Sequence, residues 1–110
     1  MARSIITAKP CWRKTDGIVG PHYAASKARL HGLTHFLASW LAVSGTTVNA
    51  LAPALIANTG TPGDSAPLRR KVPTGRLGQP SQVADLAAAI LANAYLTNQV
   101  ISLDGDIHPR

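Results

Sequence analysis

The order of three apolar segments near the start of the chain constrains the fold most strongly. Residues 3–8 and 46–52 are short runs rich in β-branched side chains, which favours buried strands. Between them, apolar side chains recur along one stripe with a period of about 3.6 residues, which predicts a helix over residues 23–43; they are Leu30, Leu33, Leu37, Trp40 and Leu41. A helix is the usual connection between parallel strands. The order therefore predicts a βαβ unit.

Glycine and proline residues mark where these elements end. Ser44-Gly45 closes the predicted helix, because glycine readily adopts the left-handed conformation, and Pro53 ends the second strand. A second helix is expected to begin at Pro80, with an apolar stripe formed by Val83, Leu86, Ala87, Ile90, Leu91 and Ala94. A third strand is expected over residues 100–103. The pattern predicts an α/β fold with a parallel sheet of about three strands and two main helices.

Composition bounds the class of protein. A chain of 110 residues that is 45% hydrophobic and 15% charged is one globular domain or part of one, and it is not a disordered polyelectrolyte. Its single cysteine, Cys11, cannot form an intrachain disulfide and has little to activate it as a reactive thiol. No segment approaches the roughly 18 consecutive apolar residues of a membrane span. We therefore expect a reducing, cytoplasmic location and no membrane partner.

Tyr23 and Lys27 are the most informative pair of polar residues. They lie four apart at the start of the predicted helix, which places them on one face. A phenol with a pKa of about 10 is a poor proton donor or acceptor at neutral pH. An ammonium group within about 4–6 Å lowers that pKa. The pair could act in acid–base catalysis, although a surface tyrosine beside a solvated lysine is the usual meaning of such spacing taken alone.

Most of the chain resembles one known family. The segments YAASKARLHGLTHFLASWLAVSG, TTVNALAPALIANTG, GRLGQPSQVADLAAAILAN and NQVISLDGD resemble, in order and spacing, the second half of short-chain dehydrogenases/reductases. The resemblance implies a partial Rossmann-like, doubly wound parallel sheet. It also implies that residues 1–110 are the C-terminal part of a single domain whose dinucleotide-binding N-terminal half is absent, because no glycine-rich turn of the required spacing occurs.

The resemblance further implies a function and a site. It implies an oxidoreductase that interconverts a ketone and an alcohol with NAD or NADP, with a small-molecule substrate and assembly into a homo-oligomer. Tyr23 would exchange the proton, while Lys27 would lower the pKa of Tyr23 and hydrogen-bond the nicotinamide ribose. The loop that cradles the nicotinamide would contain Pro53, Ala54, Ile56 and Thr59.

The chain departs from the family pattern in two respects. Pro10 stands at the position of the catalytic serine and has no hydroxyl group; Thr7 could substitute if the following loop is longer than usual. The cofactor's pyrophosphate and adenine site is missing, so we expect calorimetry on these residues alone to detect no binding of NADH or NADPH. The alternative to an enzyme is a non-catalytic interaction or dimerisation remnant, whose exposed helix faces pair with a partner.

Two further groups of residues permit other chemistry. His31 and His35 have the spacing of a helical metal pair, but the lack of an intervening glutamate and of a third ligand favours exposed helix histidines. Residues 58–78 form a long loop, with one short helix expected near 66–71, that contains Arg69, Arg70 and Lys71. The chain has few aromatic residues and no nucleic-acid motif, so its net charge of +6 is weak evidence for a nucleic-acid partner. The resemblance implies instead that this loop is a basic, solvated lid over the substrate.

Overall fold

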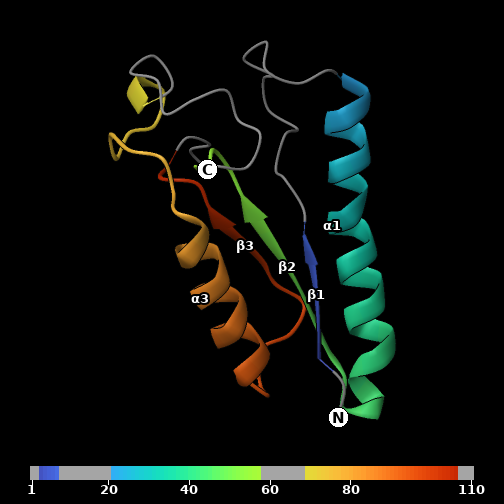
Figure 1. Ribbon diagram of the computed structural model, residues 1–110. Helices are drawn as coiled ribbons and strands as arrows, with labels where there is room; N and C mark the ends of the chain where they lie inside the picture. Colours follow the sequence, from blue (N-terminus) through green and yellow to red (C-terminus); the bar gives the residue numbers. More distant parts are fainter. Residues whose placement is uncertain (1–2, 8–20, 58–68, 107–110) are drawn as a thin grey trace.

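Three parallel strands form the sheet at the centre of the molecule (Figure 1). The computed structural model describes residues 3–7, 21–57 and 69–106. Along the chain its elements are β1 (Arg3–Thr7), α1 (Pro21–Leu41), the 3-10 helix η1 (Ala42–Ser44), β2 (Thr47–Pro53), α3 (Pro80–Ala92) and β3 (Val100–Leu103). The strand order is β1-β2-β3. The predicted α/β fold, with three parallel strands and two main helices, is confirmed.

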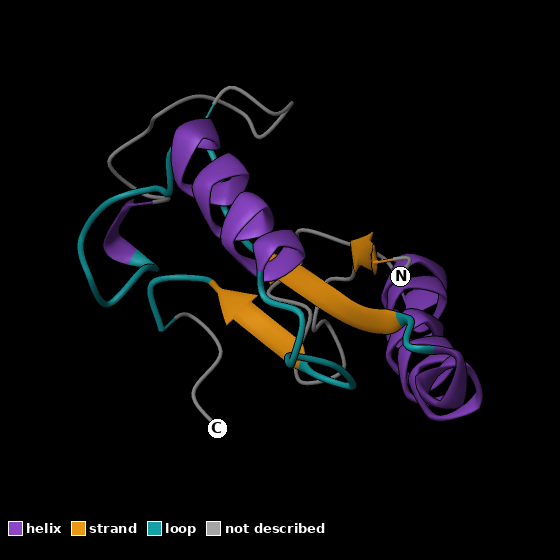
Figure 2. Cartoon of the chain, turned by 90° about the horizontal axis from the view of Figure 1, so that it is seen from below, coloured by secondary structure: helices purple, strands orange, loops and turns teal. Residues whose placement is uncertain are grey.

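The central strand β2 is covered on both faces. α1 and α3 lie on opposite sides of the sheet (Figures 1 and 2). Six successive residues of β2 are buried, with Ala50 and Ala52 completely inaccessible. Burial on both faces explains why this strand is a continuous apolar run with only Asn49 interrupting it. The arrangement is that of a doubly wound sheet.

The face of α1 that is buried differs from the predicted one. Among the side chains of α1 that the structure describes, those of Thr34 and Ala38 are fully buried, and α1 lies against β2. Small side chains here allow the helix to approach the small residues of β2 closely. The prediction that Leu33 and Trp40 belong to the buried stripe is wrong, since they are 45% and 66% exposed. The helix has apolar residues on both faces, so periodicity alone did not identify the one that meets the sheet.

The ends of the elements are close to those predicted, with local differences. α1 begins two residues before position 23 and passes into η1, which Gly45 closes in the left-handed conformation at φ 77°. Pro53 is the last residue of β2 rather than its terminator, because the next amide, of Ala54, continues the ladder to Leu103 O at 3.1 Å. α3 ends at Ala92, which leaves Ala94 outside the helix. β3 has the predicted bounds.

The other loop predictions are tested only in part. The structure describes helical residues 69–70 within the short helix expected near 66–71. Residue 8, expected at the end of the first strand, and the loop over residues 11–20 lie outside the described residues. In the described part of the chain, no helix is both long and apolar enough to cross a membrane.

A buried asparagine fixes β2 and β3 at their amino ends. Asn49 is 1% exposed; its Nδ2 donates to Leu96 O at 2.9 Å, and its Oδ1 accepts from Gln99 N at 3.2 Å. Thr97 adds a second connection, because its Oγ1 accepts from Val48 N at 3.1 Å. The turn between α3 and β3 is thereby attached to β2, which sets the register that pairs Ala50 with Val100.

Candidate functional site

The carboxyl ends of the strands and the start of α1 meet at one edge of the molecule (Figure 1). β1, β2 and β3 end there at Thr7, Pro53 and Leu103. In α/β proteins, ligands bind outside the carboxyl ends of parallel strands. This edge is therefore the candidate functional site.

The structure places the backbone of the predicted pair at this edge. Tyr23 and Lys27 lie one turn apart in the first two turns of α1, on the same face of the helix. Their side chains lie outside what the structure describes, as does the whole of Thr59. Pro10, at the serine position, is also outside the described residues, whereas Thr7 is the last residue of β1 and pairs with Leu51.

The segment that follows β2 is held from two sides. On one side, Ala54 N donates to Leu103 O at 3.1 Å. On the other side, Ile56 forms a parallel bridge with Gly78; Gly78 N donates to Leu55 O at 3.1 Å, and Ala57 N donates to Gly78 O at 2.8 Å. Of the residues predicted to cradle the nicotinamide, Pro53, Ala54 and Ile56 thus lie together on a fixed backbone.

Leu55 lies at the centre of this segment and adopts an unusual conformation. Its φ is 52°, in the left-handed region that costs a non-glycine residue roughly 1–2 kcal/mol. Its side chain is 7% exposed and belongs to a core cluster with Val72 and Leu77. Burying a leucine side chain contributes about 1.5–3 kcal/mol. The burial of the Leu55 side chain therefore offsets the cost of its backbone conformation. Val72 and Leu77, which precede α3, hold the turn after β2 in place.

Residues 72–78 are attached to β3 through a glycine. Thr74 N donates to Gly105 O at 3.3 Å. Gly105 has a φ of 59°, and a Cβ atom there would lie 2.5 Å from Val72 Cγ1 and 2.6 Å from Thr74 Oγ1. Only glycine fits this conformation and this close approach without displacement. The segment therefore connects the end of β3 to the turn that follows β2.

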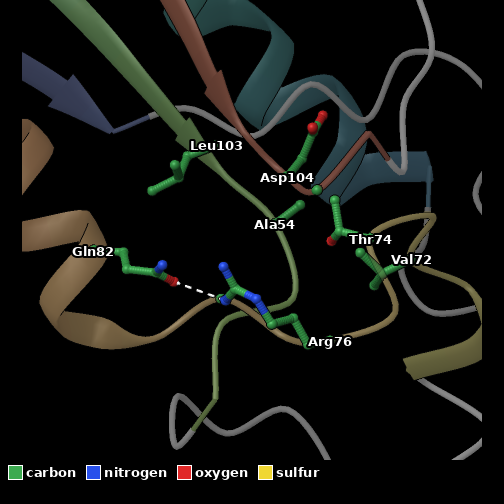
Figure 3. A pocket seen from close by; sticks show the side chains of 9 residues that line it. Ala54, Val72, Thr74, Arg76, Gln82, Leu103 and Asp104 are labelled. Atoms are coloured by element: carbon green, nitrogen blue, oxygen red, sulfur yellow. Dashed lines mark hydrogen bonds between the residues drawn. The ribbon is translucent and has the colours of Figure 1, made fainter.

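A cavity of about 200 Å³ lies between these segments and the start of α3 (Figure 3). Polar and apolar side chains line it, among them Ala54, Val72, Thr74, Arg76, Gln82, Leu103 and Asp104. Arg76 Nη1 donates to Gln82 Oε1 at 3.3 Å, and the same oxygen accepts from Gln79 N at 2.9 Å in the capping box of α3. Because Ala54 lines the cavity, the cavity directly adjoins the candidate nicotinamide segment.

The prediction of exposed helix histidines is confirmed for His35 and not for His31. His35 is exposed, and its Nδ1 lies 2.6 Å from Asn98 Oδ1, to which it can donate. His31 is half-buried, and its Nε2 is buried without a hydrogen-bond partner among the described residues. Burial, followed by the nearby His35, lowers the pKa of His31. Within the described ranges, no group of three or more potential metal ligands occurs.

Sequence reasoning overlooked the residues that hold the candidate segment in place. Gly78 lies in the segment GRLGQP and Gly105 in NQVISLDGD. These segments were used only to support the family resemblance, and neither glycine was assigned a role. Two glycines near the ends of predicted elements were the available signal, because such positions often permit close backbone approach. Which residues they approach depends on contacts between distant parts of the chain.

Comparison with known proteins agrees with this geometry. A family model described as enoyl-(acyl carrier protein) reductase matches residues 4–108. The 3-oxoacyl-[acyl-carrier-protein] reductase of Synechocystis is 41% identical over 76% of this chain and 36% of the relative. Carbonyl reductase family member 4 of Danio rerio is 39% identical over 77% of this chain and 36% of the relative. The chain spans less than half the length of these curated relatives.

Solved structures of reductases and dehydrogenases are also similar to this chain. A 3-oxoacyl-[acyl-carrier protein] reductase with bound NAD from Brucella melitensis superposes with a TM-score of 0.83 and 33% identity, covering 94% of this chain and 39% of that one. A short chain dehydrogenase from Bacillus anthracis superposes with a TM-score of 0.85 and 32% identity, covering 98% of this chain and 44% of that one. Fold and site define a Rossmann-type α/β protein. The chain belongs to the short-chain dehydrogenase/reductase family of oxidoreductases.

Proposed function

We propose that this chain forms the catalytic and nicotinamide-binding part of an NAD(P)-dependent oxidoreductase that interconverts a ketone and an alcohol. The observation that carries the proposal is the position of Tyr23 and Lys27, one turn apart in α1, at the edge where the strands end. The names of the relatives, carbonyl reductase and 3-oxoacyl-[acyl-carrier-protein] reductase, support a carbonyl substrate.

The residues at this edge fit the nicotinamide half of the cofactor. A phenol and an ammonium on one helix face provide a proton and hydrogen bonds to a ribose, and the segment from Pro53 to Ile56 provides a backbone held by β3 and Gly78. When bound, the nicotinamide supplies or accepts the hydride. The chain's own residues then bind the cofactor, orient the carbonyl and move the proton.

Tyr23 and Lys27 have distinct roles in this proposal. In the direction of reduction, the phenol of Tyr23 donates its proton to the carbonyl oxygen while the carbonyl carbon receives the hydride. The ammonium of Lys27 stabilises the resulting phenolate, which lowers the pKa of Tyr23 and makes the transfer feasible at neutral pH. Thr7 ends β1 at the same edge, so we assign to it the substrate-orienting hydroxyl that Pro10 lacks. Thr59 completes the nicotinamide loop.

A reconstituted domain tests the reaction. Residues 1–110 are joined to the N-terminal part of the Synechocystis reductase, and oxidation of NADPH and of NADH is followed with an added ketone. We expect turnover with at least one of the two nucleotides. Tyr23→Phe is expected to lower kcat by about 10²- to 10⁴-fold, because it removes the proton donor but keeps the ring.

The controls separate folding from chemistry. Circular dichroism and quenching of protein fluorescence by the nucleotide establish that each variant is folded and loaded. Lys27→Arg keeps a positive charge and is expected to retain more activity than Lys27→Ala. A folded, loaded chimera with no turnover, or a Tyr23→Phe variant as active as its parent, contradicts the proposed function.

The exposed face of α1 favours a second candidate, a non-catalytic interaction role. Phe36 and Trp40 are 64% and 66% exposed, with ring centroids 6.1 Å apart, and Val43 continues the same face at 94% exposure. Exposed apolar patches of this kind are typical of protein interfaces. Under this candidate, the chain associates with a second copy or a full-length homologue, and the oligomeric state in solution tests it.

A further inference from the structure

We propose that Gly78 is a positioning residue for the candidate nicotinamide segment, because the absence of a side chain there sets where the Ile56 side chain lies. The inference rests on the proposed function and extends it to a residue outside the segment itself. Gly78 lies between the core residue Leu77 and the start of α3, more than twenty positions along the chain from Ile56.

The geometry of this contact is specific. A Cβ atom added to Gly78 would lie 2.6 Å from Ile56 Cδ1 and 4.0 Å from Ile56 Cγ1; apart from the adjoining residues 77 and 79, no other described residue comes within 4 Å of it. Ile56 is 7% exposed, so its side chain is almost completely shielded from solvent. Among the described residues beyond its chain neighbours, alanine at position 78 would therefore displace only the Ile56 side chain.

The backbone at Gly78 makes a second, separate contribution. Gly78 N donates to Leu55 O, and Gly78 O accepts from Ala57 N, so the bridge adds residue 78 alongside the end of β2. Gly78 has no positive φ, and alanine can adopt its backbone conformation. A Gly78→Ala variant therefore keeps both hydrogen bonds and changes the position of one side chain.

Two features indicate that Gly78→Ala moves one side chain and leaves the domain folded. The atom displaced is the far end of the isoleucine side chain, which can rotate with little cost to the fold. The residues that hold the turn, Leu55, Val72 and Leu77, form their own cluster. The expected consequence of Gly78→Ala is thus a changed nicotinamide site on an otherwise intact domain.

The test measures binding of reduced nicotinamide mononucleotide, the half of the cofactor that these residues would contact. Isoleucine δ1-methyl groups of the chimera of residues 1–110 with the N-terminal part of the Synechocystis reductase are labelled, and NMR titrations give the dissociation constant; the Ile56 signal is assigned by its loss in Ile56→Val. We expect Gly78→Ala to shift the Ile56 signal and to raise the dissociation constant about fivefold or more, with the melting temperature nearly unchanged.

A double variant supplies the decisive control. Valine lacks the Cδ1 atom that the added Cβ would meet, so Gly78→Ala introduced into Ile56→Val is expected to change the dissociation constant by less than about twofold. Gly75→Ala is the matched control for stability: Gly75 has a φ of 77° and nothing within 4 Å, so alanine there strains the backbone without touching Ile56. It is expected to lower the melting temperature and leave the Ile56 signal in place.

The possible results distinguish failure of this inference from failure of the proposed function. Binding by the parent chimera that Gly78→Ala leaves unchanged overturns the inference and leaves the proposed function standing. The same loss in both the isoleucine and the valine backgrounds also overturns it, since the effect would not pass through Ile56. If the nucleotide causes no spectral change in the parent chimera, that result contradicts both the nicotinamide site and the inference built on it.

Discussion

His31 carries an unsatisfied polar atom. Its Nε2 is buried without a hydrogen-bond partner in the part of the chain that the structure describes. Leaving such an atom unpaired costs roughly 1–3 kcal/mol. Leucine has no polar side-chain atom to leave unpaired and favours the helix, so His31→Leu is expected to raise the free energy of unfolding by about 1 kcal/mol at pH 7. Urea denaturation followed by circular dichroism measures the change.

The same residue predicts a pH dependence. Burial, and to a smaller extent His35, lowers the pKa of His31 below its ordinary value of 6.5. The unfolded chain therefore takes up a proton at this position more readily than the folded one. The contribution of His31 to stability is therefore expected to be fully present above about pH 6.5 and to be lost as the pH falls below 6.5 toward the folded-state pKa.

Two variants isolate the contribution of His31. In His31→Leu, this part of the decline below pH 6.5 is expected to disappear. In His35→Gln the decline in stability is expected to become only slightly smaller, because His35 lowers the pKa of His31 less than burial does. An identical pH profile for the parent and His31→Leu contradicts the assignment.

At the scale of elements, Asn49 determines how β3 joins the sheet. Asn49→Ala leaves Leu96 O and Gln99 N without their side-chain partners in the turn between α3 and β3. The expected loss of stability is about 2–3 kcal/mol, since both groups are part-buried. Denaturant midpoints measure it, and hydrogen exchange at Ala50, whose amide bonds Gln99 O, measures loosening of the strand pair.

A milder substitution calibrates this prediction. Thr97→Val removes the hydrogen bonds of Thr97 Oγ1 with Val48 N at 3.1 Å and Val48 O at 3.5 Å at nearly constant volume, and its expected cost is about 1 kcal/mol. If Asn49→Ala destabilises no more than Thr97→Val, the asparagine does not hold the two strands together.

Across the described part of the molecule, exposed apolar side chains gather on the outer face of α1 and of η1. Leu33, Phe36, Trp40 and Val43 follow this face, whereas Thr34 and Ala38 are the residues buried beneath. A helix with two apolar faces is typical of a buried position. We therefore expect the chain to self-associate, and size-exclusion chromatography with light scattering is expected to give a dimer of defined mass.

A change on this face tests the expectation directly. Trp40→Glu is expected to shift the protein to a monomer by placing a charge in the interface. Tyr95→Glu is the control, because Tyr95 is 99% exposed and lies in the turn after α3 rather than on α1. A monomeric parent chain refutes association through α1; heterogeneous large species instead indicate an unstable sheet with exposed edges.

Local sequence patterns were enough to predict the type, order and approximate bounds of the elements. Short β-branched runs and a period of about 3.6 residues, with Gly45 and Pro80 at the helix ends, predicted the parallel α/β arrangement, because these signals depend on neighbouring residues. The local spacing of Tyr23 and Lys27 likewise predicted a pair on one helix face.

Only the tertiary structure decided which residues act on one another across the chain. It buried Thr34 rather than Trp40, brought Gly78 against Ile56, and placed Val72 over Leu55 in its left-handed conformation. The physical reason is that each of these depends on the approach of segments far apart in sequence. Local periodicity specifies that a helix forms and not which of its apolar faces meets the sheet, and a glycine indicates close approach without identifying what approaches it.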